Sequence, residues 1–220
     1  LMDQAPAGVT RTITQVIQQT VADATANSGA SSTAAVAISV NDQVADATAV
    51  ISSSMVRLRD GQSGELKGIG LIVSPSGTIL ADKSLVDSLS APSAVYPDGR
   101  TLPMAVVRFQ AQGDIAFLSP VQLLSKPAKP IIFASAARLG SSVWSLSGTT
   151  TTMLSQGIVS RVDAGDAPII QTSIPGENSM PGAPLFDATG AVVGMGTASL
   201  ATSSTASFYP LQGVRNGIPQ

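Results

Sequence analysis

Gly68-Ile-Gly-Leu-Ile-Val-Ser-Pro-Ser-Gly-Thr-Ile-Leu80 is the stretch that carries most information about the fold. Two short apolar runs, Ile69 to Val73 and Thr78 to Leu80, flank a Ser-Pro-Ser-Gly turn. Proline presets the corner of such a turn, and Gly77 supplies a backbone conformation with positive φ. This stretch therefore predicts two short strands joined by a tight turn.

Short apolar runs of the same kind extend in both directions from this hairpin. We expect a first series at 55–58, 69–73, 78–80, 94–96, 104–109 and 115–118, and a second at 131–133, 142–146, 157–161, 169–171, 184–186 and 191–195. A proline-containing stretch, Ser119 to Pro130, separates the two series. Short strands that recur every ~8–12 residues indicate an all-β barrel or sandwich.

The N-terminal region, residues 1–53, has a different pattern. Apolar residues recur with helical spacing at Val9, Ile13, Val16, Ile17 and Val21, although the β-branched content also allows a strand. A linker of small residues follows at 27–33, and 34–40 reads as a strand or extended arm. Asn41 and Asp42 are suitable caps for a short helix, which we expect to run through Val44, Ala47 and Ile51.

The C-terminal residues predict a short helix. Leu211, Val214 and Ile218 are spaced as on one helical face, whereas Gly213 and Gly217 weaken the pattern. We therefore divide the chain into an arm at 1–53, barrels at 54–125 and 126–205, and a tail at 206–220. Trp144, the sole tryptophan, lies in the middle of a predicted strand and is interpreted as a core residue.

The composition excludes several classes of function. Net charge is −2, and the 12 Lys and Arg residues form no basic stripe, so nucleic-acid binding is not expected. The chain has no Cys and no His, which removes disulfides, thiolate or imidazole metal ligands and a histidine pH switch. No apolar run is long enough to cross a membrane. We expect no cofactor and no metal site.

Five segments, taken in order, are similar to HtrA-type members of the trypsin-like serine proteases. The stretch 68–80 resembles the family's GSGFIVSPDGYILT, 96–100 its SDGR turn, and 114–118 its DLAVL segment. Likewise, 155–160 resembles TSGIVS, and 170–194 resembles the region of IQTD, GNSGGPL and GEVIGI. The resemblance covers about 54–210 and implies a chymotrypsin-like double barrel of six strands each, with the arm outside it.

The same resemblance implies that the catalytic groups are replaced. The position of the family's histidine is occupied by Ser84, and that of the nucleophilic serine by Pro181. Asp114 stands at the aspartate position, where we expect a structural role, and Ser179 at the position of a glycine that supplies an oxyanion-hole N–H. Proline has neither a hydroxyl nor an N–H, so Pro181 removes a nucleophile and a donor together. We therefore expect an inactive protease homologue.

A displaced active site is the alternative to inactivity. Ser179 would be the nucleophile and Lys83 the base, which requires that the lysine pKa fall from ~10.4 to ~7–8. Covalent labelling of Ser179 by a fluorophosphonate would identify such a dyad. The non-catalytic interpretation is that Ser179 is a surface serine on a loop and that Lys83 is a solvated lysine.

Two non-catalytic functions follow from these patterns. Only 12% of residues are charged, against ~25% in typical domains, and mean hydropathy is +0.30. This composition favours a structural subunit of an extracellular or cell-surface assembly, joined into a homo-oligomer or polymer by the arm. The alternative for the arm is that it packs on its own domain. The alternative function is a pseudoprotease, monomeric or a small oligomer, that binds a peptide or protein in the vestigial groove.

Overall fold

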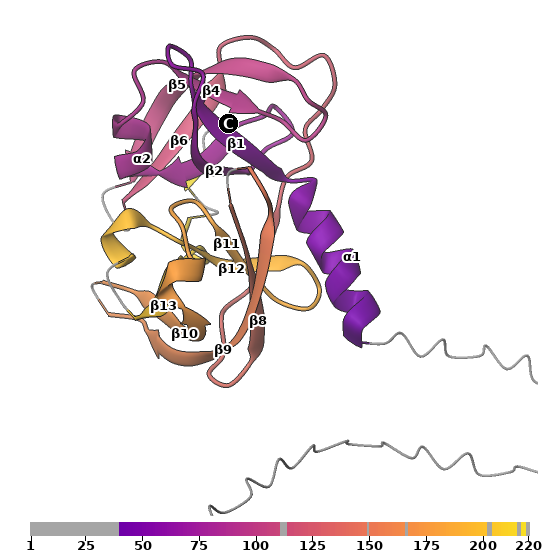
Figure 1. The fold of residues 1–220 in the computed structure, drawn as a ribbon, viewed down its shortest axis with the longest axis vertical. Helices are drawn as coiled ribbons and strands as arrows, with labels where there is room; N and C mark the ends of the chain where they lie inside the picture. The colour runs from indigo at the N-terminus through magenta and orange to yellow at the C-terminus, as the bar shows by residue number, and fades with distance from the viewer. Residues whose placement is uncertain are drawn as a thin grey trace, which may run out of the picture. The chain divides into compact units, whose positions relative to one another are not determined.

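The computed structural model describes residues 40–110, 114–148, 150–165, 167–201, 204–214 and 217–218. The predictions for residues 9–21, 27–33 and 34–39 lie outside this part of the chain. The described chain consists mainly of short antiparallel strands, and Figure 1 shows them as two neighbouring barrels with one longer helix beside the second. This is the predicted all-β class and the chymotrypsin-like architecture.

The first barrel has six strands in the closed order β1-β2-β3-β6-β5-β4. They are β1 (Met55–Asp60), β2 (Leu66–Ile72), β3 (Ile79–Asp82), β4 (Pro92–Val95), β5 (Thr101–Gln110) and β6 (Ile115–Pro120). The β2–β3 hairpin is the one predicted from the Ser-Pro-Ser-Gly turn, and Gly77 has a φ of 88°. A one-turn helix, α2 (Lys83–Asp87), follows β3 directly.

The second barrel also has six strands, in the order β11-β8-β9-β10-β13-β12, and is closed by a β11–β12 pairing. Its strands are β8 (Ser142–Ser147), β9 (Met153–Asp163), β10 (Ile169–Pro175), β11 (Pro184–Phe186), β12 (Ala191–Met195) and β13 (Thr205–Pro210). A short strand, β7 (Ile132–Phe133), pairs in parallel with β12 outside the ring. Two 3-10 turns, η1 (Gly176–Asn178) and η2 (Ala198–Leu200), lie between the strands.

Three clusters of buried apolar side chains stabilise the two barrels. One fills each barrel, and the third lies between them. The third cluster joins Phe117 of the first barrel to Phe186 of the second and includes Trp144, which is 4% exposed and so has its predicted core position. Burying side chains of this size stabilises the fold by ~1.5–3 kcal/mol each.

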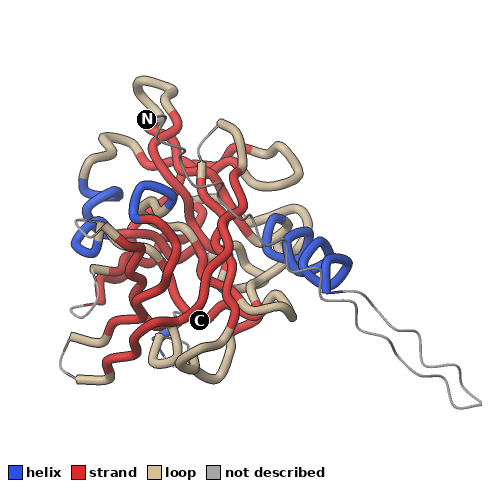
Figure 2. The backbone as a smooth tube through the Cα atoms, turned by 60° about the horizontal axis from the view of Figure 1, so that its bottom comes forward, coloured by secondary structure: helices blue, strands red, loops and turns tan. Residues whose placement is uncertain are grey.

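The predicted helix after the arm is α1 (Val40–Ser52). Ala47 and Ile51 are 3% and 0% exposed and pack into the cluster between the barrels. The helix begins at Val40, so Asn41 and Asp42 lie in its first turn rather than before it. Figure 2 shows α1 against the outside of the strands. Residues 40–52 thus form part of the packed domain and not a separate arm.

One boundary in the C-terminal region differs from the prediction. β13 pairs with β10, so the second barrel extends to Pro210, whereas we had placed its end at residue 205. Beyond it, Val214 N is bonded to Leu211 O, and Gly217 N is bonded to Val214 O. Leu211 and Val214 are fully buried. The predicted helix through Leu211, Val214 and Ile218 falls partly outside the described residues and stays a prediction.

Candidate functional site

The region in which the sequence resemblance placed the triad positions contains a carboxylate that the sequence analysis did not single out, Asp82. Asp82 ends β3 and caps α2, and its side chain is fully buried. Its Oδ1 accepts hydrogen bonds from Leu85 N at 2.8 Å and from Ser84 Oγ at 2.6 Å, and its Oδ2 accepts one from Ala198 N at 2.9 Å. Three donors thus compensate the burial of this charged group.

Ser84 is exposed on the first turn of α2. Its hydroxyl proton is directed to Asp82, so Ser84, which the resemblance placed at the histidine position, donates to a buried carboxylate. Ser84 has an aliphatic hydroxyl in place of an imidazole, which is the group that accepts a proton near neutral pH.

Asp114 lies at the start of β6 with an exposed side chain and a φ of 51°. Aspartate tolerates this left-handed conformation better than most residues. The main-chain oxygen of Asp114 accepts a hydrogen bond from Lys83 N at 2.6 Å, so Asp114 fixes the entry into α2 through its backbone. The carboxylate that meets Ser84 belongs to Asp82 and not to Asp114.

The ammonium group of Lys83 contacts two side chains at the surface. It forms an ion pair with Asp87 one turn later and lies 5.2 Å from the centre of the Phe109 ring. The hydrogen bond to Asp87 raises the pKa of Lys83, and the charges of Asp114 and Asp82 act in the same direction. A general base would need the opposite shift.

Residues 175–183 form the segment to which the sequence resemblance assigned the nucleophile position and the oxyanion hole. The chain leaves β10, makes the η1 turn and reaches Ser179, whose N–H donates to Gly176 O at 3.1 Å. Pro181 has no N–H. The next two N–H groups donate to main-chain carbonyls, Gly182 to Gly196 at 2.8 Å and Ala183 to Met180 at 3.0 Å.

Close backbone contacts fix this segment in place. Gly182 has a φ of 85°, and a Cβ there would lie 1.9 Å from Ile69 O of the first barrel. A Cβ on Gly196 would lie 2.6 Å from Met180 O. The side chain of Met180 packs against the cluster between the barrels, and its sulfur lies 2.9 Å from Gly148 N. The loop is therefore held by both barrels.

Residues 68–195 match the model of the trypsin-like peptidase domain. Since the match spans more than half of the sequence, the chain belongs to the trypsin-like peptidase family. A comparison with curated proteins found no match. Within the described residues, no helix is both long and apolar enough to span a membrane, and no group of three acidic residues could hold a metal ion.

The site residues that the sequence analysis named lie on two segments of the structure, and one carboxylate beside them was not named. Ser84 and Lys83 lie on α2, and Ser179 and Pro181 lie on the segment after η1. Asp82 was missed, although an aspartate directly before a short helix is a signal for an N-cap. No local sequence pattern indicates the contact between Asp82 and Ala198, because the two residues are 116 positions apart.

Proposed function

We propose that this trypsin-like domain is non-catalytic and acts as a structural subunit of an extracellular or cell-surface assembly. The segment from Ser179 to Ala183 carries the first part of the proposal. Pro181 offers no nucleophile and no N–H, and the N–H of Ser179 is already bonded to Gly176 O. An oxyanion therefore meets neither of the donors that the family reaction requires.

The losses of catalytic rate expected from these replacements support this proposal. An enzyme that lacks its triad keeps ~10³–10⁴-fold rate enhancement over water, most of it from the oxyanion hole and from binding. Removing one oxyanion donor costs a further ~10²–10³-fold. The alternative Ser179–Lys83 dyad is disfavoured because Asp87 raises the lysine pKa.

The test of the first part is a reaction with a fluorophosphonate probe, with mass spectrometry to locate the label, next to a casein hydrolysis assay. We expect no label and no hydrolysis above the buffer rate, with trypsin as the positive control. A label on Ser179, or hydrolysis that purifies with the protein and is lost in Ser179→Ala, would contradict the proposal.

The surface supports the second part of the proposal. Large apolar side chains are exposed over both barrels and their connections, with Leu123 at 98%, Leu139 at 71% and Val121 at 64% exposure. The four ion pairs of the described residues are all local, since each joins partners two or four positions apart. A surface with so much apolar area and so little charge suits contact with other protein chains.

Assembly can be tested on the full chain by light scattering and electron microscopy, next to a variant that lacks residues 1–39. The deletion should end before α1, because Ala47 and Ile51 belong to the core. We expect the full chain to form large particles or filaments and the shortened chain to be a folded monomer. A monodisperse full-length monomer would refute the structural role and leave the peptide-binding alternative.

A further inference from the structure

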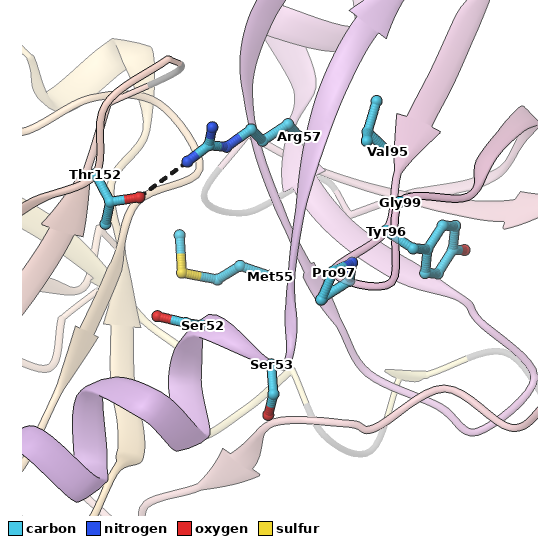
Figure 3. Close-up of a pocket in the computed structure, with 9 residues that line it drawn as sticks. All are labelled: Ser52, Ser53, Met55, Arg57, Val95, Tyr96, Pro97, Gly99 and Thr152. Carbon is cyan, nitrogen blue, oxygen red and sulfur yellow. Dashed lines mark hydrogen bonds between the residues drawn. The ribbon is translucent and has the colours of Figure 1, made fainter.

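A cavity of about 510 Å³ lies on the domain away from the vestigial triad and shares no residue with it. It opens between the end of α1, the start of β1, the β4–β5 turn and the β8–β9 connection. The residues that matter for its chemistry are Ser52, Met55, Arg57, Pro97 and Thr152 (Figure 3). Its size is within the range of pockets that hold small ligands, ~300–1,000 Å³.

The cavity exists because two paired strands separate. β1 and β4 are paired from Asp60 opposite Pro92 to Arg57 opposite Val95. Beyond Val95 the chain turns through Tyr96 and Pro97, and a proline at that point has no N–H to continue the ladder. Met55 pairs with Leu71 of β2 on one side and borders the opening on the side of β4.

Arg57 spans this opening from the first barrel to the second. Its guanidinium donates to Thr150 O at 3.2 Å and to Thr152 Oγ1 at 2.9 Å, both in the β8–β9 connection. Figure 3 shows Arg57 and Thr152 above the side chain of Met55, with Ser52 on the other side of it. The arginine is thus held in one orientation by two neutral acceptors.

The described residues that line the cavity with Arg57 include no carboxylate. Among the described residues, none of the ion pairs includes Arg57. A guanidinium has five N–H donors, and two hydrogen bonds leave further donors that can meet a carboxylate. Met55 and Pro97 add apolar contact surface beside it.

We propose that this cavity binds the carboxylate of a peptide, with an adjacent apolar side chain packed on Met55 and Pro97. The positive charge selects the carboxylate, and the open rim, where Ser52, Pro97 and Thr152 are exposed, leaves room for the rest of an extended chain. A bound peptide contacts both barrels, because Arg57 and Thr152 come from different ones. The proposal is independent of catalytic activity and of assembly.

The carboxylate is supplied either by a chain terminus or by an aspartate side chain. Three probes separate these sources: Ac-Ala-Ala-Val-Leu with a free carboxylate, the same peptide as its C-terminal amide, and Ac-Ala-Asp-Val-Leu amide. Each is titrated into the ¹⁵N-labelled full chain while the Arg57 Nε–H signal and the amide signals of Met55 and Thr152 are followed by NMR.

We expect at least one carboxylate probe to shift these signals and the neutral amide to bind about tenfold more weakly or not at all. The Arg57→Gln variant should lose binding by a similar factor. Arg161→Gln, which removes a charge of the same sign outside the cavity, should bind like the unmodified chain.

Equal binding of all three probes, or no shift with any of them, would overturn the proposal. So would carboxylate binding that Arg57→Gln leaves unchanged. If Arg57→Gln does not fold, the comparison between acid and amide on the unmodified chain still decides. Binding by the terminal carboxylate alone identifies chain ends as the ligand, and binding by the aspartate probe alone identifies internal acidic segments.

Discussion

Oδ2 of Asp82 in the first barrel accepts a hydrogen bond of 2.9 Å from the backbone N–H of Ala198 in the second. The same carboxylate caps α2 and accepts the hydroxyl of Ser84. The carboxylate of Asp82 thus accepts three hydrogen bonds from two barrels. The hydrogen bond between Asp82 and Ala198 thus links the two barrels through a buried side chain.

Replacing this carboxylate should destabilise the domain. We expect Asp82→Ala to lower the free energy of unfolding by about 2–4 kcal/mol, since it removes an N-cap and leaves buried donors without a partner. Urea denaturation monitored by Trp144 fluorescence measures the loss. Asp87→Ala, which removes an exposed carboxylate on the same helix, should change stability little. Equal effects of the two variants would refute the role assigned to Asp82.

Gly182 and Gly99 provide a matched pair for testing how tightly the loop is held. Both have a φ of 85°, but a Cβ at Gly99 meets nothing within 4 Å, whereas one at Gly182 lies 1.9 Å from Ile69 O. We expect Gly99→Ala to cost about 1–2 kcal/mol from backbone strain alone. Gly182→Ala should cost about 4 kcal/mol or more, or prevent folding. Similar midpoints of thermal unfolding for the two variants would show that the loop can move away from β2.

Restoring the hydroxyl at position 181 should not restore catalysis. We expect Pro181→Ser to remain unlabelled by a fluorophosphonate, because Ser84 provides no imidazole and the Ser179 N–H stays bonded to Gly176 O. The combination of Pro181→Ser with Ser84→His supplies both side chains and tests whether the backbone alone prevents the reaction. Labelling of the single variant at residue 181 would show that the loop rearranges into a working oxyanion hole.

The strands were predictable from sequence because local patterns specify them. The Ser-Pro-Ser-Gly turn placed β2 and β3, and the spacing of Val44, Ala47 and Ile51 placed α1. β13 was missed because its serine and threonine neighbours resemble a loop, and its strand character comes from pairing with β10. Contacts between distant segments, such as Arg57 with Thr152, have no local signal at all.

The stability of the domain should fall at alkaline pH because of Tyr96. Burial raises the pKa of its phenol to about 12, and its hydroxyl donates to Gly77 O at 2.8 Å. The unfolded chain loses this proton near ~10, so between about pH 10 and 12 the folded state binds more protons and stability decreases as pH rises. This contribution of Tyr96 to the free energy of unfolding is fully present below pH ~10 and amounts to about 2–3 kcal/mol.

Tyr96→Phe should be less stable at pH 8, because Gly77 O loses its donor, and should show a shallower decline in urea midpoint from pH 9 to 11. Burial also raises the pKa of Tyr209, so a residual decline should persist in Tyr96→Phe. An unchanged pH dependence in Tyr96→Phe would show that Tyr96 is not the group responsible.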